Sequence, residues 1–471
     1  MKLLKRTRTT PKCKRRRALA LRFALLLAIG SCWISGCGQE APETALWAAA
    51  KQPMQKISGA YSQEKVAGLH HEDKWQLPSQ WDNRRIGRTA SIKNQGDLGT
   101  CWAFAALGAL EILELPQNLE NFSVDHLALN HGFTATMEEG GNFNMALSYL
   151  AGWKGPVWEA DDPYADGVTN PEAAVRAHLQ EAQLLENDRY AIKEAVLQNG
   201  SVQSSLYADE AILYADQSTM YYAADTCAYY YDGPVQYNHD VLIIGWDDTY
   251  SRDNFAITPP GDGAFICQNS WGETFGEQGF FYVSYYDTTI GQNTITYSRL
   301  DNPENYDHLY QHDLLGWTGQ VGYEQESAWG ANLFTATGQE EISAVSFYTT
   351  DALTSYEIYI DLEPQVSEGQ IDFSSRQLVA RGSQKNAGYY TVDLSKPLAL
   401  ESGQSFAVLI YVNTPGASMP LAAEYQGSAG AENAQVNAGE SYISENGTRW
   451  QDCGGDLLCN ICLKALTNDC A

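Results

Sequence analysis

The sequence predicts an α+β domain followed by an all-β sandwich domain. Two observations predict the first domain: an apolar, alanine-rich helical pattern at residues 101–113, and a succession of strand-like runs from residue 202 onward. Helices early and strands later favour an α+β layout in which the two kinds are segregated. After residue 300 the apolar runs are short, β-branched or aromatic and bounded by turns, which is typical of a sandwich. A length of 471 residues allows two to four domains.

The helices of the first domain have recognisable start and stop signals. The pattern at residues 101–113 ends shortly before Pro116, where a helix should stop. Ser123 is a suitable N-cap for a helix over residues 124–130. Two further segments have a helical pattern: residues 143–150 and 171–180.

Strand predictions complete both domains. In the first domain we expect strands at residues 202–207, 240–245, 263–268 and 279–285. In the second domain we expect strands at residues 344–349, 356–361, 389–394, 406–412 and 441–444. We place the first domain at residues 77–299 and the second at residues 300–471.

Charge and composition exclude some classes of function. The chain is 44% hydrophobic, which suits globular domains rather than disorder. Its formal net charge is −28, although the first 36 residues contain ten Lys or Arg and no acid. An acidic body repels nucleic-acid phosphates, so no nucleic-acid partner is expected, and the acidity is read as a solubility feature.

The basic head has the features of an export signal. A basic stretch precedes an apolar stretch at residues 18–29, and Ile34-Ser35-Gly36-Cys37 follows. This run resembles the lipobox of bacterial lipoproteins, in which cleavage precedes the cysteine and its thiol takes a lipid; the alternative is an ordinary signal or an uncleaved anchor. We therefore expect residues 1–36 to be a lipoprotein signal peptide and Cys37 to be lipidated. A lipid anchor would then be the only membrane contact, with the protein outside the cytoplasm, at the bacterial cell surface or secreted. Residues 37–76 read as a tether or short pro-segment.

The other cysteines do not identify a metal site. Cys459 and Cys462 have the spacing of half a zinc site, yet no histidine lies near them and the context is strand-like. Export permits disulfides, and sequence alone cannot pair them. We expect disulfides or buried thiols there, no metal and no organic cofactor. Residues 247–254 and the His70-His71-Glu72-Asp73 run are interpreted as solvated segments.

A glycine-rich turn delivers Cys101 to the start of the helix predicted at residues 101–113. The N–H groups and the positive end of a helix dipole favour a thiolate at such a position, and the thiolate is the nucleophilic form of cysteine. Gln95 lies six residues upstream. Its amide can reach the sulfur and, with the N–H of Cys101, form an oxyanion hole.

A base and an orienting group are also present. His239 immediately precedes an apolar strand, 138 residues after Cys101. Asn269 ends another apolar strand 30 residues later, in an Asn-Ser-Trp-Gly run. An asparagine carbonyl can accept the imidazole N–H and fix the ring without adding a charge. Trp271 can cover that bond from water and is placed with the substrate-binding residues.

These segments resemble the papain family of cysteine peptidases over residues 77–285. The resemblance rests on the Gln-x5-Cys-Trp segment, the histidine before a strand and the Asn-Ser-Trp-Gly run, with weaker echoes at Gly140-Gly141-Asn142 and Asp162-Pro163-Tyr164. It implies a helical lobe carrying Cys101, a β lobe carrying His239 and Asn269, and a cleft between them. It also implies peptide hydrolysis through an acyl-enzyme, with Gly140 and Gly141 at the edge of the cleft.

The sequence departs from the family pattern beside the nucleophile. Leu98 stands where the family usually has a disulfide cysteine, and Thr100 stands where serine or alanine is commoner. Losing that bridge should loosen the lobe or require packing by Leu98. Residues 165–235 align poorly, which leaves the substrate pocket undefined.

The second domain resembles the lectin-like β-sandwich that follows papain-like domains in some bacterial and archaeal surface proteins. The resemblance is carried by Gly316-Trp317, residues 328–332, residues 345–348, residues 387–390 and residues 462–465. Its tryptophans and tyrosines suit either sugar stacking or a sandwich core. We favour a structural or docking role, and contact with glycans or the cell envelope is the other expectation.

The sequence therefore predicts a cysteine endopeptidase that acts on peptide or protein substrates. Cys101, His239, Asn269 and Gln95 are its catalytic residues, and Gly140, Gly141 and Trp271 bind substrate. Two alternatives stay open. One is a surface binding protein for glycan or protein that uses the peptidase fold as a scaffold. The other is a transpeptidase-type acyl transferase, because both reactions share an acyl-enzyme.

Overall fold

The computed structural model describes residues 76–209, 212, 217–367 and 370–470. The predicted signal peptide, the lipidation site at Cys37 and all but the last residue of the predicted tether lie outside these ranges. Across the part that is described, no helix combines the length and apolarity needed to cross a membrane.

The helices of the described residues lie mostly in the first domain. They are α3 (Cys101–Glu114), α4 (Val124–Asn130), α5 (Phe143–Ala151), α6 (Arg189–Asn199) and α7 (Cys453–Asp456), with 3-10 turns at η2 (Asn83–Ile86), η4 (Ala224–Thr226) and η5 (Arg252–Asn254). The helices predicted at residues 101–113, 124–130 and 143–150 are confirmed. Ser123 caps α4 as expected, because its side chain accepts a hydrogen bond from the N–H of His126 at 3.0 Å.

The strands are more numerous. Those up to residue 301 are β1 (Gln80–Asp82), β2 (His178–Leu185), β3 (Val202–Leu206), β4 (Tyr222–Ala223), β5 (Ala228–Tyr229), β6 (His239–Asp247), β7 (Ala264–Gln268), β8 (Phe280–Ser284) and β9 (Thr294–Asp301). The later strands are β10 (His308–Tyr310), β11 (Gly319–Val321), β12 (Ser327–Thr335), β13 (Glu340–Thr349), β14 (Thr354–Asp361), β15 (Gln365–Ser367), β16 (Gln370–Asp372), β17 (Gln377–Gln384), β18 (Ala387–Leu400), β19 (Ser405–Asn413), β20 (Leu421–Tyr425), β21 (Ser441–Ser444), β22 (Gln451–Asp452), β23 (Cys459–Ile461) and β24 (Leu463–Asp469). Every strand predicted from the sequence overlaps one of these.

The helix predicted at residues 171–180 is wrong. This stretch is irregular, and its last residues begin β2. Contacts with other segments keep this stretch non-helical. The N–H of Arg176 donates to the carbonyl of Pro156. The guanidinium of Arg176 lies 3.6 Å from the ring centre of Trp158 and pairs with Asp161. These contacts outweigh a weak helical pattern.

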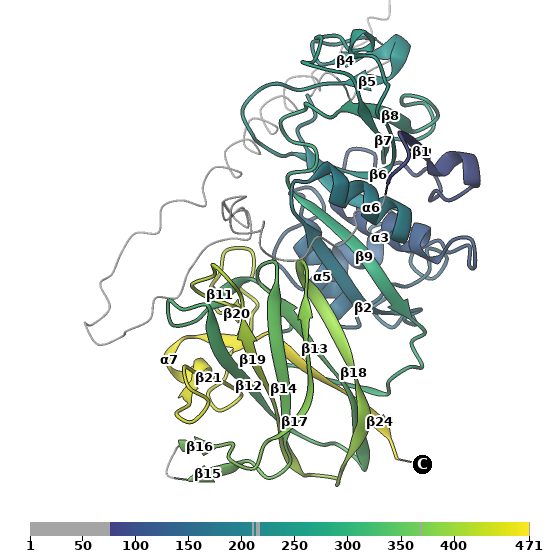
Figure 1. Ribbon diagram of the computed structural model, residues 1–471. Helices are drawn as coiled ribbons and strands as arrows, with labels where there is room; N and C mark the ends of the chain where they lie inside the picture. The colour runs from purple at the N-terminus through teal and green to yellow at the C-terminus, as the bar shows by residue number, and fades with distance from the viewer. Residues whose placement is uncertain (1–75, 210–211, 213–216, 368–369, 471) are drawn as a thin grey trace, which may run out of the picture. The chain divides into compact units, whose positions relative to one another are not determined.

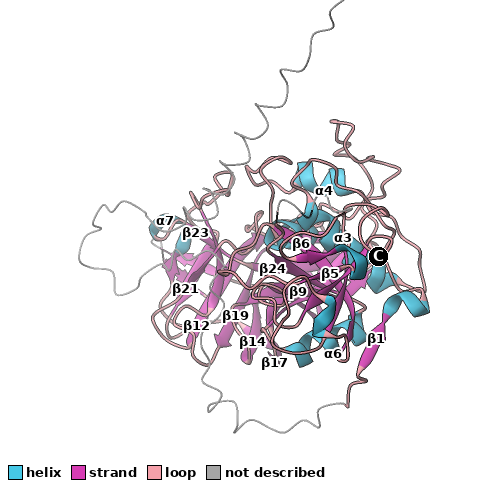
Figure 2. Cartoon of the chain, turned by 90° about the horizontal axis from the view of Figure 1, so that it is seen from above, coloured by secondary structure: helices cyan, strands magenta, loops and turns pink. Residues whose placement is uncertain are grey.

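Helix α6 was not predicted, although its sequence carries both end signals. Asp188 caps its start by accepting from the N–H of Tyr190, and Gly200 follows its end with a φ of 95°. The helix lies between β2 and β3 in the chain, so helices and strands are only partly segregated in order. Figure 2 shows α3, α4 and α6 gathered around the strands of the first domain.

The central strands position the helix that carries Cys101. Strand β6 pairs with β3 on one side and β7 on the other, and α3 packs across this sheet (Figure 1). Leu242 and Ile244 of β6 join the core around α3, whereas Val241 and Ile243 join the core on the opposite face. The alternation of a strand therefore separates two hydrophobic layers, one under α3 and one inside the β lobe.

The second domain is a β-sandwich. Its outer sheet has the order β17-β14-β19-β12-β21-β22, and it packs against β13, β18, β20, β23 and β24. Buried side chains from both sheets form the core, among them Phe347 of β13 and Ile358 of β14. The described cysteines of this domain are free thiols: Cys453, Cys459 and Cys462 are buried and Cys470 is exposed.

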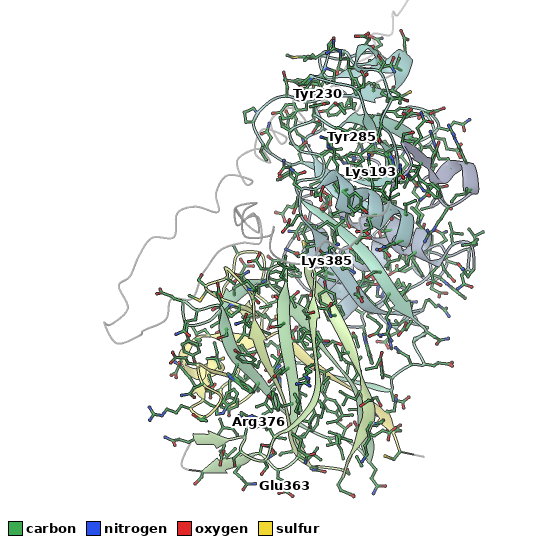
Figure 3. The ribbon with its side chains drawn as sticks, in the orientation of Figure 1. Lys193, Tyr230, Tyr285, Glu363, Arg376 and Lys385 are labelled. Atoms are coloured by element: carbon green, nitrogen blue, oxygen red, sulfur yellow. The ribbon has the colours of Figure 1, made fainter. Side chains whose placement is uncertain are left out.

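The two domains share a sheet. Strand β18 of the sandwich pairs antiparallel with β2, with Gly388 opposite Gln183 and Tyr389 opposite Ala182. A β-carbon on Gly388 would overlap the carbonyl oxygen of Ala182, so this close pairing requires glycine. Lys385 lies beside this junction and pairs with Glu194 of α6 at 3.6 Å (Figure 3). The sandwich is therefore joined to the first domain by main-chain hydrogen bonds.

Buried charges also lie near the junction. Lys464 and Asp313 form an ion pair of 2.6 Å, with exposed side-chain fractions of 1% and 0%. Glu424 accepts hydrogen bonds from the N–H of Leu315 and from Asn460. Burial raises the pKa of Glu424 to about 7. The cluster is held by hydrogen bonds, as buried charged groups require.

Candidate active site

Cys101 is the first residue of α3, and the preceding turn leaves the end of this helix open. Thr100 occupies the N-cap position but makes no capping hydrogen bond to the helix. Its hydroxyl is instead 2.6 Å from the hydroxyl of Tyr164. The N–H groups of Ala103 and Phe104 donate to the carbonyl of Thr100, so those of Cys101 and Trp102 are the ones that remain available at the thiol.

The turn before Cys101 is pressed against the glycine pair of residues 140–141. The N–H of Gly99 donates to the carbonyl of Met137, and a β-carbon on Gly99 would lie 2.9 Å from the backbone of Gly140. A β-carbon on Gly141 would overlap the ring of Trp102. Both glycines therefore lie beside the helix start that carries Cys101.

Gln95 is buried and tied to the opposite side of the site. Its N–H donates to the carbonyl of Ser270 at 2.8 Å, and its side-chain oxygen accepts from the Ser270 hydroxyl at 2.7 Å. Its amide nitrogen donates to the carbonyl of Leu98 at 2.7 Å. An amide nitrogen has two hydrogens, so a second donor remains on Gln95.

His239 and Asn269 are directly hydrogen-bonded. The Nε2 atom of His239 lies 2.7 Å from the Oδ1 atom of Asn269. Because a carbonyl oxygen only accepts, Nε2 carries the proton and Nδ1 is left as the basic nitrogen. Trp271 stacks on the His239 ring at 4.5 Å between ring centres. The imidazole is thereby fixed in both tautomer and orientation.

The sulfur of Cys101 lies at the start of the strand that carries His239. The N–H of Asp240, the residue after His239, hydrogen-bonds to the thiol and lowers its pKa. The N–H groups of Trp102 and Cys101 act in the same direction, which is the effect expected at a helix start. Three segments that are distant in the chain thus meet at the cysteine, the histidine and the asparagine.

The effect of burial on the pKa of Cys101 outweighs the effect of those N–H groups. Burial raises the pKa of Cys101 to about 12, and the nearby carboxylate of Asp240 adds to the rise. Burial lowers the pKa of His239 to about 4, against the opposing hydrogen bond to Asn269. The N–H groups at the helix start lower the pKa of Cys101, as the sequence predicts, but burial raises that pKa by more. At neutral pH this arrangement favours a neutral thiol beside a neutral imidazole.

Three residues near the site were not assigned a role from the sequence. Ser270 orients the amide of Gln95, and its place inside the Asn-Ser-Trp-Gly run was the available signal. Tyr164 donates to the carbonyl of Gln95 at 2.9 Å and contacts Thr100, so it supports the turn before Cys101. Asp240 is buried at 7% exposure beside the thiol, and only its position next to His239 could have indicated it.

The described residues contain no group of three or more side chains arranged to hold a metal. At the end of β6, Asp247 accepts from Gln80 at 2.9 Å. Asp248 is bound by Lys193 and Tyr285, which lie close together in Figure 3. Protein partners therefore engage these carboxylates. The His70-His71 run lies outside the described residues.

Family models match both parts of the chain. The model described as papain family cysteine protease matches residues 77–298, and the model described as lectin like domain matches residues 309–467. Cathepsin F of Drosophila melanogaster is 28% identical over 254 residues, covering 53% of this chain and 38% of that protein. Cathepsin S of Mus musculus is 30% identical over 227 residues, covering 44% of this chain and 59% of that protein. The chain spans between 38% and 60% of the length of the curated relatives reported for it.

A solved structure matches across both domains. It contains the cysteine protease and lectin-like domains of Cwp84, a surface layer associated protein of Clostridium difficile. The identity is 27% and the TM-score is 0.73, with 84% of this chain and 90% of that chain covered. A second structure of Cwp84, after propeptide cleavage, has the same identity and TM-score and is covered completely. Residues 77–298 therefore form a domain of the papain family of cysteine proteases, and a lectin-like domain follows over residues 309–467.

Proposed function

We propose that this protein is a cysteine endopeptidase in which Cys101 is the nucleophile and His239 the general acid and base. Gln95 and the N–H of Cys101 stabilise the oxyanion, and Asn269 orients the imidazole. The observation that carries this proposal is the 2.7 Å hydrogen bond between His239 Nε2 and Asn269 Oδ1, with the N–H of Asp240 on the Cys101 thiol. Together these contacts leave the basic Nδ1 atom of the imidazole for the sulfur.

The chemistry follows from these groups. The thiol proton of Cys101 passes to His239 as the sulfur attacks the peptide carbonyl carbon, which leaves a negative charge on the carbonyl oxygen. Two donors meet that charge: the second amide hydrogen of Gln95 and the N–H of Cys101. The imidazolium then protonates the departing amine as the carbon–nitrogen bond breaks. Water, deprotonated by His239, releases the acyl group as a carboxylic acid and restores the thiol.

The substrate is proposed to be an extended peptide segment. Gly140 and Gly141 lie against the start of α3: Gly140 has a φ of 88°, which favours glycine, and a β-carbon on Gly141 would overlap the Trp102 ring. Main chain without side chains allows a substrate strand to approach closely and pair by hydrogen bonds. Trp271 covers the His239–Asn269 bond, which keeps water from competing for it.

The site of action is proposed to be the outer cell surface of a bacterium, with a lipid on Cys37 as the membrane anchor. The basic head and the Ile34-Ser35-Gly36-Cys37 run support this location. The surface-layer association stated for the relative Cwp84 agrees with it. The lectin-like domain is proposed to act as a structural or docking element, since β18 continues the sheet of the protease domain.

Labelling with an epoxysuccinyl thiol-directed probe tests the catalytic proposal. The purified protein is incubated with the probe under reducing conditions between pH 5 and 7, and labelled peptides are mapped by mass spectrometry. We expect labelling at Cys101 that Cys101→Ala abolishes together with hydrolysis of fluorescent casein. Cys227→Ala is the matched control, because Cys227 is a partly exposed thiol of the same domain. Probe incorporation that ignores Cys101, or hydrolysis that survives Cys101→Ala, would refute the assignment.

The same assay separates hydrolysis from acyl transfer. Cleavage of a defined peptide with an added amine gives either a free carboxylate or an amide product, which mass spectrometry distinguishes. We expect the free carboxylate to dominate. A dominant amide product would favour the transferase instead.

A further inference from the structure

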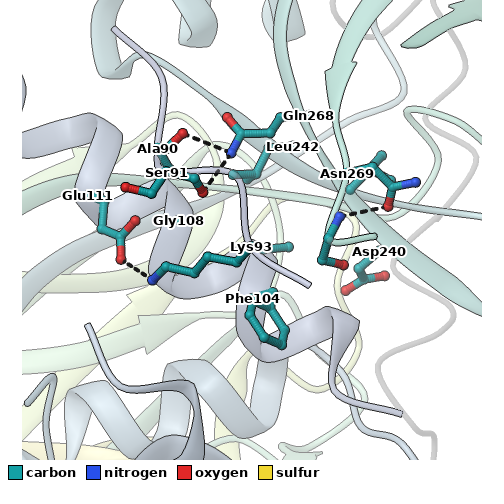
Figure 4. Close-up of a pocket in the computed structure, with 13 residues that line it drawn as sticks. Ala90, Ser91, Lys93, Phe104, Gly108, Glu111, Asp240, Leu242, Gln268 and Asn269 are labelled. Atoms are coloured by element: carbon teal, nitrogen blue, oxygen red, sulfur yellow. Dashed lines mark hydrogen bonds and ion pairs between the residues drawn. The ribbon is translucent and has the colours of Figure 1, made fainter. Parts of the chain in front are cut away.

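Asp240 lies directly after His239 but faces the other way. His239, Val241 and Ile243 alternate with Asp240, Leu242 and Ile244 along β6, and the second set faces α3. Asp240 lines a small cavity of about 20 Å³ between α3 and the sheet, together with Phe104 and Asn269 (Figure 4). A carboxylate thus lies in the interface between the helix that carries Cys101 and the strand that carries His239.

One glutamine links this carboxylate to the helix. The Nε2 atom of Gln203 lies 2.8 Å from Asp240 Oδ2 and 3.2 Å from the carbonyl oxygen of Trp102. Gln203 is held in place because Tyr297 donates to its side-chain oxygen at 3.3 Å. Ser205, opposite Asp240 on β3, also hydrogen-bonds to the carboxylate. The first turn of α3, strand β3 and strand β6 are therefore joined through Asp240 and Gln203.

We propose that Asp240 is a positioning residue for the Cys101–His239 pair. Through Gln203 it fixes the start of β6 against the first turn of α3, which sets the distance between sulfur and imidazole. The negative charge of its carboxylate also opposes ionisation of Cys101. This inference rests on the proposed roles of Cys101 and His239.

Two opposing effects of the same residue support the charge part of the proposal. The N–H of Asp240 lowers the pKa of Cys101, whereas its carboxylate raises it. Burial raises the pKa of Asp240, and the hydrogen bonds from Ser205 and Gln203 oppose that rise. Titratable and charged groups surround Asp240 on its own strand and on the elements packed against it. They are His239 (β6), Cys101 (α3), Tyr297 (β9) and the cavity-lining pair Lys93 and Glu111.

Three variants separate the two parts of the proposal. Asp240→Asn keeps an acceptor for Gln203 and removes the charge. Gln203→Ala removes the link to Trp102 and keeps the carboxylate. Asp240→Ala removes both. Tryptophan fluorescence and thermal unfolding of each variant identify any protein that fails to fold. If the alanine variants fail to fold, the near-isosteric Asp240→Asn still tests the proposal.

The first readout is the rate of alkylation of Cys101 by iodoacetamide at pH 8, mapped by mass spectrometry to distinguish this thiol from Cys227 and Cys470. We expect Cys101 of Asp240→Asn to react about tenfold faster than in the wild type, because a unit charge a few ångströms away shifts a thiol pKa by about one unit or more. Equal or slower alkylation in Asp240→Asn would overturn the charge part. Alkylation does not depend on turnover, so this result stands apart from any failure of the proposed peptidase function.

The second readout is hydrolysis of fluorescent casein. For Gln203→Ala and Asp240→Ala we expect kcat to fall about tenfold or more with KM nearly unchanged, since a small displacement of a nucleophile from its base is costly. Gln203→Ala should leave alkylation at pH 8 within about twofold of the wild type, because the charge remains. Unchanged kcat in both alanine variants would refute the positioning role.

Discussion

The hydroxyl of Ser270 donates to the side-chain oxygen of Gln95 at 2.7 Å, and the carbonyl of Ser270 accepts from the N–H of Gln95. These two hydrogen bonds join the segment before α3 to the segment after β7. They also determine which end of the Gln95 amide is presented to the site, because the oxygen is already occupied by Ser270. The donor end then faces the region where the proposed oxyanion would form.

Replacing Ser270 by alanine should weaken oxyanion stabilisation without changing substrate binding. The Gln95 amide would lose the contact that holds its orientation, and we expect kcat to fall about tenfold with KM nearly unchanged. Gln95→Ala removes the donor itself and should cost about 10²- to 10³-fold in kcat. The double variant should be no slower than Gln95→Ala alone, because Ser270 is proposed to act through Gln95. Additive losses in this kinetic comparison would show that Ser270 acts independently.

The acidic limb of the activity profile should lie near pH 4. Burial lowers the pKa of His239 to about 4, so the imidazole stays neutral and basic until the pH falls to that value. An exposed imidazole would become protonated near pH 6.5 instead. The measurement is kcat/KM for casein hydrolysis from pH 3.5 to 8, with tryptophan fluorescence recorded at each pH to exclude unfolding. A limb at pH 6 to 7 in folded protein would contradict the buried position of His239.

Gly388→Ala should destabilise the junction between the two domains. The added β-carbon would meet the carbonyl of Ala182 and push β18 away from β2. We expect a loss of about 1–3 kcal/mol in the free energy of unfolding, which is the usual cost of forcing an extra carbon into a packed interface. Gly455→Ala is the matched control, since a β-carbon there finds its nearest neighbour at an ordinary contact distance of 3.7 Å. Similar unfolding curves for both variants would mean that the shared sheet contributes little.

Glu424 should make the protein less stable as the pH rises from about 4.5 to 7. Its pKa in the folded protein is raised to about 7, so the folded state binds a proton in this range that the unfolded chain has lost. The stability contributed by the protonated form is complete below pH 4.5 and is lost as the pH passes through 7. Glu424→Gln removes this dependence. We expect the free energy of unfolding of Glu424→Gln, measured with urea relative to the wild type, to be about 1–3 kcal/mol higher at pH 8 than at pH 5.

Each protein is compared with itself at pH 5 and pH 8. Any cost of packing the glutamine is the same at both pH values and therefore cancels. A difference between variant and wild type that stays the same at both pH values would show that Glu424 titrates normally. Lys464 and Asp313 are unchanged in this experiment, which keeps the neighbouring ion pair as a constant background.

The sequence alone predicted the candidate catalytic residues and determined the local elements that carry them. A cysteine at a helix start, a histidine before an apolar strand and an asparagine after another strand are local patterns, and α3, β6 and β7 begin or end where those patterns predict. The cap at Ser123 and the short strands of the sandwich were equally predictable. Each depends on propensity and periodicity within a few residues.

Tertiary structure alone decided which residues from distant parts of the chain contact one another. The irregular course of residues 171–177 depends on Trp158 and Asp161, and the pairing of β18 with β2 joins residues about two hundred positions apart. The charge state of the site was also decided there, because burial acts against the thiolate that the helix end favours. Asp240 shows the same limit: its position next to His239 marks it in the sequence, but its relation to Cys101 exists only because α3 packs across β6. Burial and long-range contacts sum over residues far apart in the chain, and no local pattern records that sum.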